Sequence, residues 1–333
     1  MKNSSKKNNN LNKVAYYPGC SLNSTAIDFN VSVKKLLDVL DIEHIEIDDW
    51  NCCGTTPANN IDEELVVLLS ARNLMIAKNM GLEDILSPCV SCYNKLYKAA
   101  YYINSTSELK NKREEKIKAS IFKTLKDMGF DTGQELNFKV YSIIEFLYLK
   151  KAEISRKFRE LKQVNNENEE YSILKELIPV CYYGCALLRP KDALRFDDVE
   201  RPTSMEEILK EVGIECVDFS FKTECCGAIL SLSNKDSVLK LSGEVLDNAL
   251  ENNADSLIVF CQLCQQNLDL RQKQINRFNK TRYNLPILYI TQVLGVALGL
   301  TFKQVMLDRL FVPIKSPGRS KVKSHNNDKG RLN

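Results

Sequence analysis

The chain has 333 residues, 44% of them hydrophobic, and a formal net charge of +3. Its length allows two domains with separate cores, while no run of about 18 apolar residues is present to span a membrane. The charge is unevenly distributed, because residues 1–13 carry four Lys and residues 313–333 carry six Lys or Arg and one Asp, which leaves a net charge of −6 between them. We therefore predict two disordered basic tails, and the acidic body excludes nucleic acid as the main partner.

The N-terminal residues predict an intracellular protein. They are rich in Lys and Asn with no apolar segment behind them, so they do not form a secretory signal, and we expect the chain in the cytoplasm. In that reducing compartment, clustered cysteines more often bind metals or carry out redox chemistry than form structural disulfides. The 12 cysteines of this chain are therefore its first candidates for function.

The first predicted domain, residues 14–162, alternates strands with helices. Strands are predicted over residues 14–17, 42–47 and 84–88, and a helix follows each of them. The strands run into three cysteine groups, which are Cys20, then Cys52 and Cys53, then Cys89 and Cys92. Successive β-α units build a parallel sheet with right-handed crossovers, so all three groups are predicted at the carboxyl edge of one sheet.

The second predicted domain, residues 177–312, repeats this order. Its strands are predicted over residues 178–183, 215–219 and 256–260, and they lead to Cys185, then Cys225 and Cys226, then Cys261 and Cys264. The first domain is predicted to carry a helical insertion after its cysteine groups, and residues 140–149 are expected to add a strand or helix to it. Residues 163–176 are predicted to be the linker between the two domains. The fold class is therefore α/β, with two duplicated, Rossmann-like parallel-sheet domains.

Ten of the 12 cysteines form two sets of five with similar spacing. From the single cysteine to the adjacent pair there are 32 residues in one set and 40 in the other, and from the pair to the Cys-x-x-Cys there are 36 and 35. We call them the first quintet (Cys20, Cys52, Cys53, Cys89, Cys92) and the second quintet (Cys185, Cys225, Cys226, Cys261, Cys264). The other two, Cys181 and Cys216, are predicted to be buried packing residues.

Five thiols in one place suit an iron–sulfur cluster better than zinc. A structural zinc ion takes four ligands, which the adjacent pair and the Cys-x-x-Cys would already supply, so that Cys20 and Cys185 would be left over. Neighbouring thiols diverge in an extended chain, but in a cluster they can bind different irons. Gly54 and Gly227, which follow the pairs, are predicted to let the backbone pass close to such a cluster. Zinc, or thiol redox chemistry without a metal, stays open as an alternative.

The doubled pattern resembles that of the twin CCG-domain proteins, in particular the B subunits of heterodisulfide reductases. The similarity extends from Val14 to about Phe311. Besides the quintets it is carried by Tyr16-Tyr17-Pro18-Gly19-Cys20-Ser21-Leu22, Asp49-Trp50-Asn51-Cys52-Cys53-Gly54, Arg201-Pro202-Thr203 and Gln292-Val293-Leu294-Gly295. A doubled motif of five cysteines is far more specific than a single Cys-x-x-Cys.

The resemblance implies that each quintet holds one noncubane 4Fe–4S cluster. In this family a disulfide, which in methanogens is the mixed disulfide of coenzyme M and coenzyme B, lies between the clusters and is cleaved to thiols in two one-electron steps. The sequence has no ferredoxin-type cysteine run and no Gly-x-Gly-x-x-Gly motif. Electrons must therefore come from partners, which the resemblance implies are the ferredoxin-type iron–sulfur subunit and the flavin subunit of a heterodisulfide reductase-like complex.

The chain departs from the methanogen pattern at two positions. Tyr182 stands where those proteins often have His, and Gly54 where they often have Pro, so the chain looks closer to the bacterial and non-methanogen forms. Tyr182 and Tyr183 are candidate proton donors, with structural packing as the alternative. Two other functions stay open, namely an electron-relay iron–sulfur subunit of a respiratory-type dehydrogenase and a zinc-bound interaction module.

Overall fold

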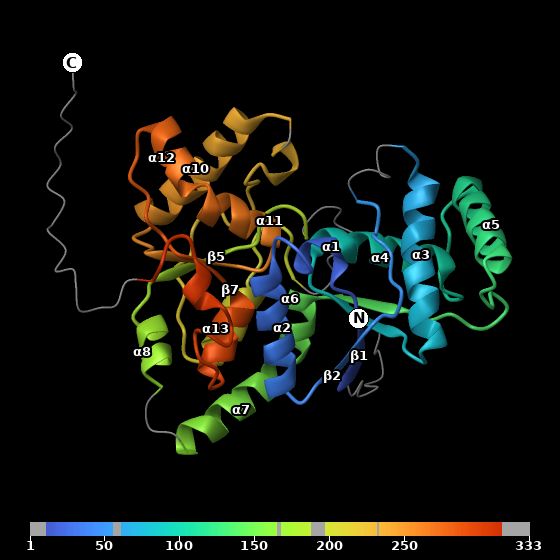
Figure 1. Cartoon of the computed structure of the whole chain (residues 1–333), viewed down its shortest axis with the longest axis horizontal. Helices are drawn as coiled ribbons and strands as arrows, with labels where there is room; N and C mark the ends of the chain where they lie inside the picture. The colour runs from blue at the N-terminus through green and yellow to red at the C-terminus, as the bar shows by residue number, and fades with distance from the viewer. Residues whose placement is uncertain (1–10, 56–60, 165–167, 188–196, 232, 315–333) are drawn as a thin grey trace, which may run out of the picture.

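The computed structural model describes residues 11–55, 61–164, 168–187, 197–231 and 233–314 (Figure 1). Almost all of the two predicted basic tails lies outside these residues. Each half of the chain builds a parallel sheet flanked by helices, so the predicted α/β class is confirmed.

The first sheet has four parallel strands in the order β2-β1-β3-β4. Their bounds are β1 (Lys13–Tyr16), β2 (Glu43–Glu46), β3 (Asp84–Ser87) and β4 (Lys139–Ser142). Val14, Ala15 and Tyr16 of the inner strand β1 are fully buried, as expected for a strand with helices on both faces. The stretch 140–149 supplies β4 and the helix that follows it.

The second sheet repeats this topology with β5 (Pro179–Tyr182), β6 (Ser256–Val259) and β7 (Ile287–Tyr289), in the order β5-β6-β7. The predicted strand 215–219 forms only one parallel bridge, between Val217 and Val180 of β5. Because Val180 also pairs with Leu257 of β6, Val217 lies along the other edge of β5, where β2 lies beside β1. The two halves therefore share one strand order, which supports a duplication.

Three helices of the first half start at polar caps. The helices of this half are α1 (Gly19–Leu22), α2 (Ile27–Val39), α3 (Glu63–Asn79), α4 (Val90–Ile103), α5 (Lys112–Asp127), α6 (Ile143–Leu149) and α7 (Lys151–Val164). The side chain of Asp62 accepts a hydrogen bond from the backbone of α3, and Asn111 and Ser142 do the same for α5 and α6. Such caps satisfy backbone N–H groups that have no partner inside the helix.

The helices of the second half include one in the predicted linker. Their bounds are α8 (Glu169–Lys175), α9 (Ser204–Lys210), α10 (Lys235–Glu251), α11 (Gln262–Gln265), α12 (Gln272–Asn279) and α13 (Ile290–Ala297). Segment 163–176 contains the end of α7 and all of α8, where Tyr171 and Leu174 are buried. In the part of the chain that is described, no helix has both the length and the apolar character needed to cross a membrane.

The halves pack through equivalent helices. Helix α2 packs on α13 and α6 packs on α9, and by position along the chain α2 corresponds to α9 and α6 to α13. The rings of Phe29 and Tyr289 stack at 4.3 Å, and the hydroxyls of Ser32 and Thr291 lie 2.7 Å apart in the same contact. In Figure 1, α2 and α13 stand side by side in the middle of the molecule. The junction thus has the reciprocal form of a two-fold interface.

Candidate functional site

The first quintet gathers at the carboxyl edge of the first sheet. Cys20 lies in α1 after β1, the adjacent pair follows β2, and Cys89 directly precedes α4. The Sγ atoms of Cys53 and Cys92 are 3.3 Å apart. Burial raises the pKa of the Cys52 thiol, and the nearby thiols of Cys53 and Cys20 raise it further. The structure therefore brings these five cysteines together.

The second quintet has the same arrangement. The Sγ atoms of Cys226 and Cys264 are 3.6 Å apart. Burial raises the pKa of Cys185 to about 12, with further contributions from the thiols of Cys225, Cys226 and Cys261. Both sets predicted from spacing are thus local clusters in space, each at the end of its own sheet.

Two buried thiols of each quintet are hydrogen-bonded to each other. The contact between Cys53 and Cys92 lowers the pKa of Cys53 to about 6 and raises that of Cys92 well above its usual value. The contact between Cys226 and Cys264 acts in the same way, and the pKa of Cys226 falls to about 7. Metals bind the thiolate form. Each site therefore has one thiol that ionises near neutral pH.

Two glycines allow the chain to pass directly beside sulfur. Gly19 and Gly184, which precede the single cysteines, have φ of +72° and +63°. A Cβ on Gly19 would lie 2.7 Å from Sγ of Cys92, and one on Gly184 would lie 3.1 Å from Sγ of Cys264. The sequence pattern predicts a close approach of the backbone at Gly54 and Gly227, whose backbone nitrogens lie 3.4 and 3.3 Å from Sγ of Cys52 and Cys225. A Cβ on Gly227 would meet the backbone of α10.

Two equivalent tyrosines hold the adjacent pairs in place. The Tyr17 hydroxyl donates to the carbonyl of Asn51, and the Tyr182 hydroxyl donates to the carbonyl of Glu224, each at 2.7 Å. These carbonyls belong to the residues just before the two pairs. Both tyrosines are buried, and burial raises the pKa of each well above its usual value.

The two candidate proton donors lie in different surroundings. The Tyr182 side chain lies among the second quintet, where its hydroxyl is engaged with the backbone. The Tyr183 hydroxyl donates to Glu206 at 2.5 Å and accepts from the backbone N–H of Met205 at 2.7 Å. The structure therefore brings Tyr182 to the second quintet, whereas the hydroxyl of Tyr183 is engaged with Glu206 and Met205.

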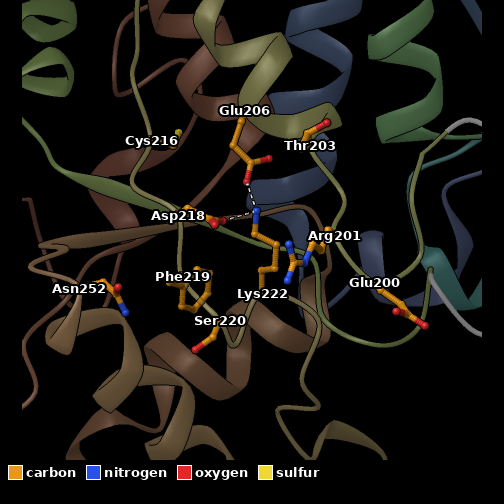
Figure 2. Close-up of a pocket in the computed structure, with 10 residues that line it drawn as sticks. All are labelled: Glu200, Arg201, Thr203, Glu206, Cys216, Asp218, Phe219, Ser220, Lys222 and Asn252. Atoms are coloured by element: carbon orange, nitrogen blue, oxygen red, sulfur yellow. Dashed lines mark hydrogen bonds and ion pairs between the residues drawn. The ribbon is translucent and has the colours of Figure 1, made fainter.

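The remaining cysteines contact each other away from both quintets. The Sγ atoms of Cys181 and Cys216 are 3.5 Å apart. Cys181 is buried, as predicted, whereas Cys216 is partly exposed on the wall of a cavity of about 670 Å³ (Figure 2). Inside this cavity Lys222 pairs with Glu206 and Asp218, at 2.8 and 2.7 Å. No quintet cysteine lines this cavity, so it is separate from the candidate site.

The two quintets lie against each other at the junction of the halves, where the resemblance leads us to expect them, and side chains that the sequence did not single out connect them. Gln262, between Cys261 and Cys264, donates through Nε2 to Sγ of Cys89 at 2.9 Å. Asn94, two residues after Cys92, donates to the carbonyl of Ala186, next to Cys185, at 2.8 Å. Its counterpart in the second half, Gln266, donates to the carbonyl of Thr25 at 3.1 Å. The contacts are again reciprocal.

The donor set fits an iron–sulfur cluster better than a single ion. Within the described residues, no three or more His, Cys, Asp or Glu side chains form a ready site for one metal ion. The thiols contact one another in pairs instead, five to a site, and thiolates are the usual ligands of iron–sulfur clusters. Gly19 and Gly184 also keep side chains away from the sulfur atoms.

Comparison with known proteins identifies the repeat. The family described as "CCG: Cysteine-rich domain" matches residues 14–97 and 180–269, which contain both quintets. A protein of Wolinella succinogenes, the membrane anchor of an 8-methylmenaquinol:fumarate reductase, is 28% identical, covering 88% of this chain and 95% of its own. A protein of Methanosarcina mazei, named as the B subunit of ferredoxin:CoB-CoM heterodisulfide reductase, is 25% identical, covering 90% and 93%.

One solved structure has the same fold. The crystal structure of a hypothetical protein from Helicobacter pylori superposes with a TM-score of 0.66 at 15% sequence identity, over 91% of this chain. This chain spans 52% of the length of that one.

Proposed function

Because the chain belongs to the cysteine-rich CCG domain family, we propose that it is the disulfide-reducing component of a heterodisulfide reductase-like complex. The observation that carries this proposal is the meeting of two equivalent quintets at one junction, where Gln262 reaches Cys89. A disulfide has two sulfur atoms, so two adjoining sites can engage both of them at once. The substrate would be CoM-S-S-CoB or an analogue, as the name of the Methanosarcina mazei relative suggests.

In this proposal the two quintets hold two noncubane 4Fe–4S clusters, one each. When bound, the clusters would supply single electrons and iron positions for the substrate sulfurs. The chain itself positions the ligands. Tyr17 and Tyr182 fix the backbone before the adjacent pairs. Gly19 and Gly184 have no Cβ that would clash with the thiols of Cys92 and Cys264. The contacts of Tyr182 thus support a positioning role rather than proton donation.

The exposure of the cysteines indicates the side from which a substrate approaches. Cys20 and Cys52 are exposed and Cys185 and Cys225 are partly exposed, whereas the other quintet members are buried. We propose that the disulfide reaches the junction from the side of these four thiols. The Cys-x-x-Cys thiols are buried. Electrostatic interactions are stronger in the protein interior than in water, because the local dielectric is lower.

Other proteins of the complex would supply the electrons. The sequence carries no dinucleotide-binding or ferredoxin-type motif. Two Methanosarcina relatives are named as components of ferredoxin-dependent heterodisulfide reductases, so related chains work inside complexes. We propose a ferredoxin-type iron–sulfur protein and a flavoprotein, each a separate chain of the complex, as the partners.

A combined metal and activity measurement tests the proposal. The protein is purified without oxygen and analysed for iron, sulfide and zinc, and then candidate disulfides are added with a reduced viologen dye. We expect about eight irons per chain and dye oxidation that releases two thiols per disulfide. One or two zinc ions without iron would support the zinc-bound interaction module and overturn the proposal.

A second candidate function is an electron relay within a larger complex. It is supported by the fumarate reductase relative of Wolinella succinogenes, which matches over 95% of its own length. In a relay the same clusters would pass electrons without cleaving a disulfide. About eight irons per chain, with no thiol released from any disulfide and rapid electron transfer to a quinol-linked partner, would favour the relay.

A further inference from the structure

Gln262 connects the two quintets directly. It belongs to α11, between two cysteines of the second quintet, yet its Nε2 donates to Sγ of Cys89 in the first quintet at 2.9 Å. The side chain is 2% exposed. Among the described residues its Oε1 atom has no hydrogen-bond partner. The contact is therefore a buried bond from one half of the chain to a sulfur atom of the other.

The equivalent position in the first half cannot make this bond. Val90 follows Cys89 as Gln262 follows Cys261, and Val90 is 1% exposed. An apolar side chain is thus compatible with burial at this position. A buried amide oxygen without a hydrogen-bond partner destabilises the folded state. The buried amide of Gln262 therefore destabilises the folded state, which points to a function beyond packing.

The other hydrogen bonds to sulfur come from within each half. The backbone N–H of Gly54 contacts Cys52 at 3.4 Å, and that of Gly227 contacts Cys225 at 3.3 Å, so these two are equivalent. The hydroxyl of Thr55 lies 3.2 Å from Sγ of Cys53 in the first half.

The closest counterpart in the second half is weaker. Nδ2 of Asn267 lies 3.8 Å from Sγ of Cys226, and its nearer contact, at 3.2 Å, is with the carbonyl of that residue. Among these contacts to sulfur, that of Gln262 is the shortest, and Gln262 is the donor that comes from the opposite half.

A hydrogen bond to a ligand sulfur changes the redox chemistry of a cluster. Reduction adds negative charge that spreads onto the sulfurs, and an N–H donor stabilises that charge, which raises the reduction potential. The effect is larger in a buried site because the local dielectric is low.

We propose that Gln262 is a positioning residue that raises the reduction potential of the first site above that of the second. Electrons entering the pair would then settle first on the first quintet's cluster, which makes the two otherwise equivalent sites unequal. This inference rests on the proposed function, because it requires a cluster in each quintet.

The test compares Gln262→Met with wild type in anaerobically prepared, cluster-loaded full-length chain. Met keeps the length of the side chain and removes the N–H donor. We expect unchanged iron content and a shift of one midpoint potential to more negative values in an EPR-monitored titration. Val90→Met, in the matching position, is expected to move neither potential.

Two further variants assign the shift and guard against misfolding. In a Cys185→Ser background, which keeps only the first site, Gln262→Met should still lower the potential, and in a Cys20→Ser background it should not. Gln262→Glu retains the shape of the side chain and should lower the first potential as well, because a carboxylate opposes added negative charge.

The outcomes separate this inference from the proposed function. A wild-type chain without iron overturns both. Two clusters whose potentials do not change in Gln262→Met and Gln262→Glu overturn the role of Gln262 alone, as does a shift confined to the second site.

Discussion

Gly19→Ala is expected to remove one metal site while the fold survives, and Gly81→Ala is its matched control. Both glycines have left-handed backbone, with φ of +72° and +77°. Alanine in that conformation costs roughly 1–2 kcal/mol. The surroundings differ, because a Cβ on Gly81 meets nothing within 4 Å, whereas a Cβ on Gly19 would lie 2.7 Å from Sγ of Cys92.

The clash at Gly19 falls on Cys92, a proposed cluster ligand. An ordinary contact of a Cβ begins at 3.4 Å, so Cys92 must move by about 0.7 Å to reach it. Ligand distances in metal sites are held within about 0.2 Å. We therefore expect Gly19→Ala to lose about half of the iron of the wild type, whereas Gly81→Ala keeps all of it.

Two measurements decide the matter. Urea unfolding of the metal-free chains should show similar losses of about 1–2 kcal/mol in both variants, and iron analysis should separate them. Full iron in Gly19→Ala would refute the reasoning, since it would mean that the Cys92 thiol is not held against the chain at Gly19. Loss of iron in Gly81→Ala as well would trace the effect to general destabilisation.

Three further predictions concern a cysteine of the second quintet, the Tyr182 hydroxyl and the buried Glu145. Cys185→Ser should lose about half of the iron while Cys216→Ser keeps all of it, as measured by iron analysis, and equal losses would contradict the separation of the quintets from Cys216. Tyr182→Phe leaves the carbonyl of Glu224 without its donor, and chemical denaturation should show a loss of about 1–2 kcal/mol; an unchanged midpoint would refute it. Burial raises the pKa of Glu145 to about 7, so the folded state holds this proton more tightly than the unfolded state. The free energy of unfolding should therefore fall as pH rises from about 4.5 to 7, by ~3 kcal/mol at most, and Glu145→Gln should flatten that part of a stability–pH curve.

The sequence patterns predicted the parts of this fold that depend on local signals. Each strand that precedes a cysteine group has an apolar run or an alternating pattern of its own, and parallel β-α units place the ends of their strands at one edge. The positions of both quintets could therefore be predicted without coordinates. The segment 215–219 was the exception, because at a sheet edge it makes only the bridge from Val217 to Val180.

Contacts between the halves could not be predicted in the same way. The bond from Gln262 to Cys89 joins residues 173 positions apart, and no periodicity encodes such a pairing. The close approach at Gly19 depends on where the thiol of Cys92 lies, and no local pattern marks it, whereas the approach expected at the glycine after each pair is made by its backbone N–H. The segment 163–176 has a polar composition typical of a linker, yet Tyr171 and Leu174 on one face of α8 are buried.

The reciprocal packing of α2 on α13 and of α6 on α9 has an evolutionary consequence. Before the gene doubled, a single-repeat ancestor could have self-associated through this same surface, with two identical copies forming one working centre. Fusion into one reading frame then allowed the two copies to diverge, so that Val90 and Gln262 could become different residues at one ancestral position.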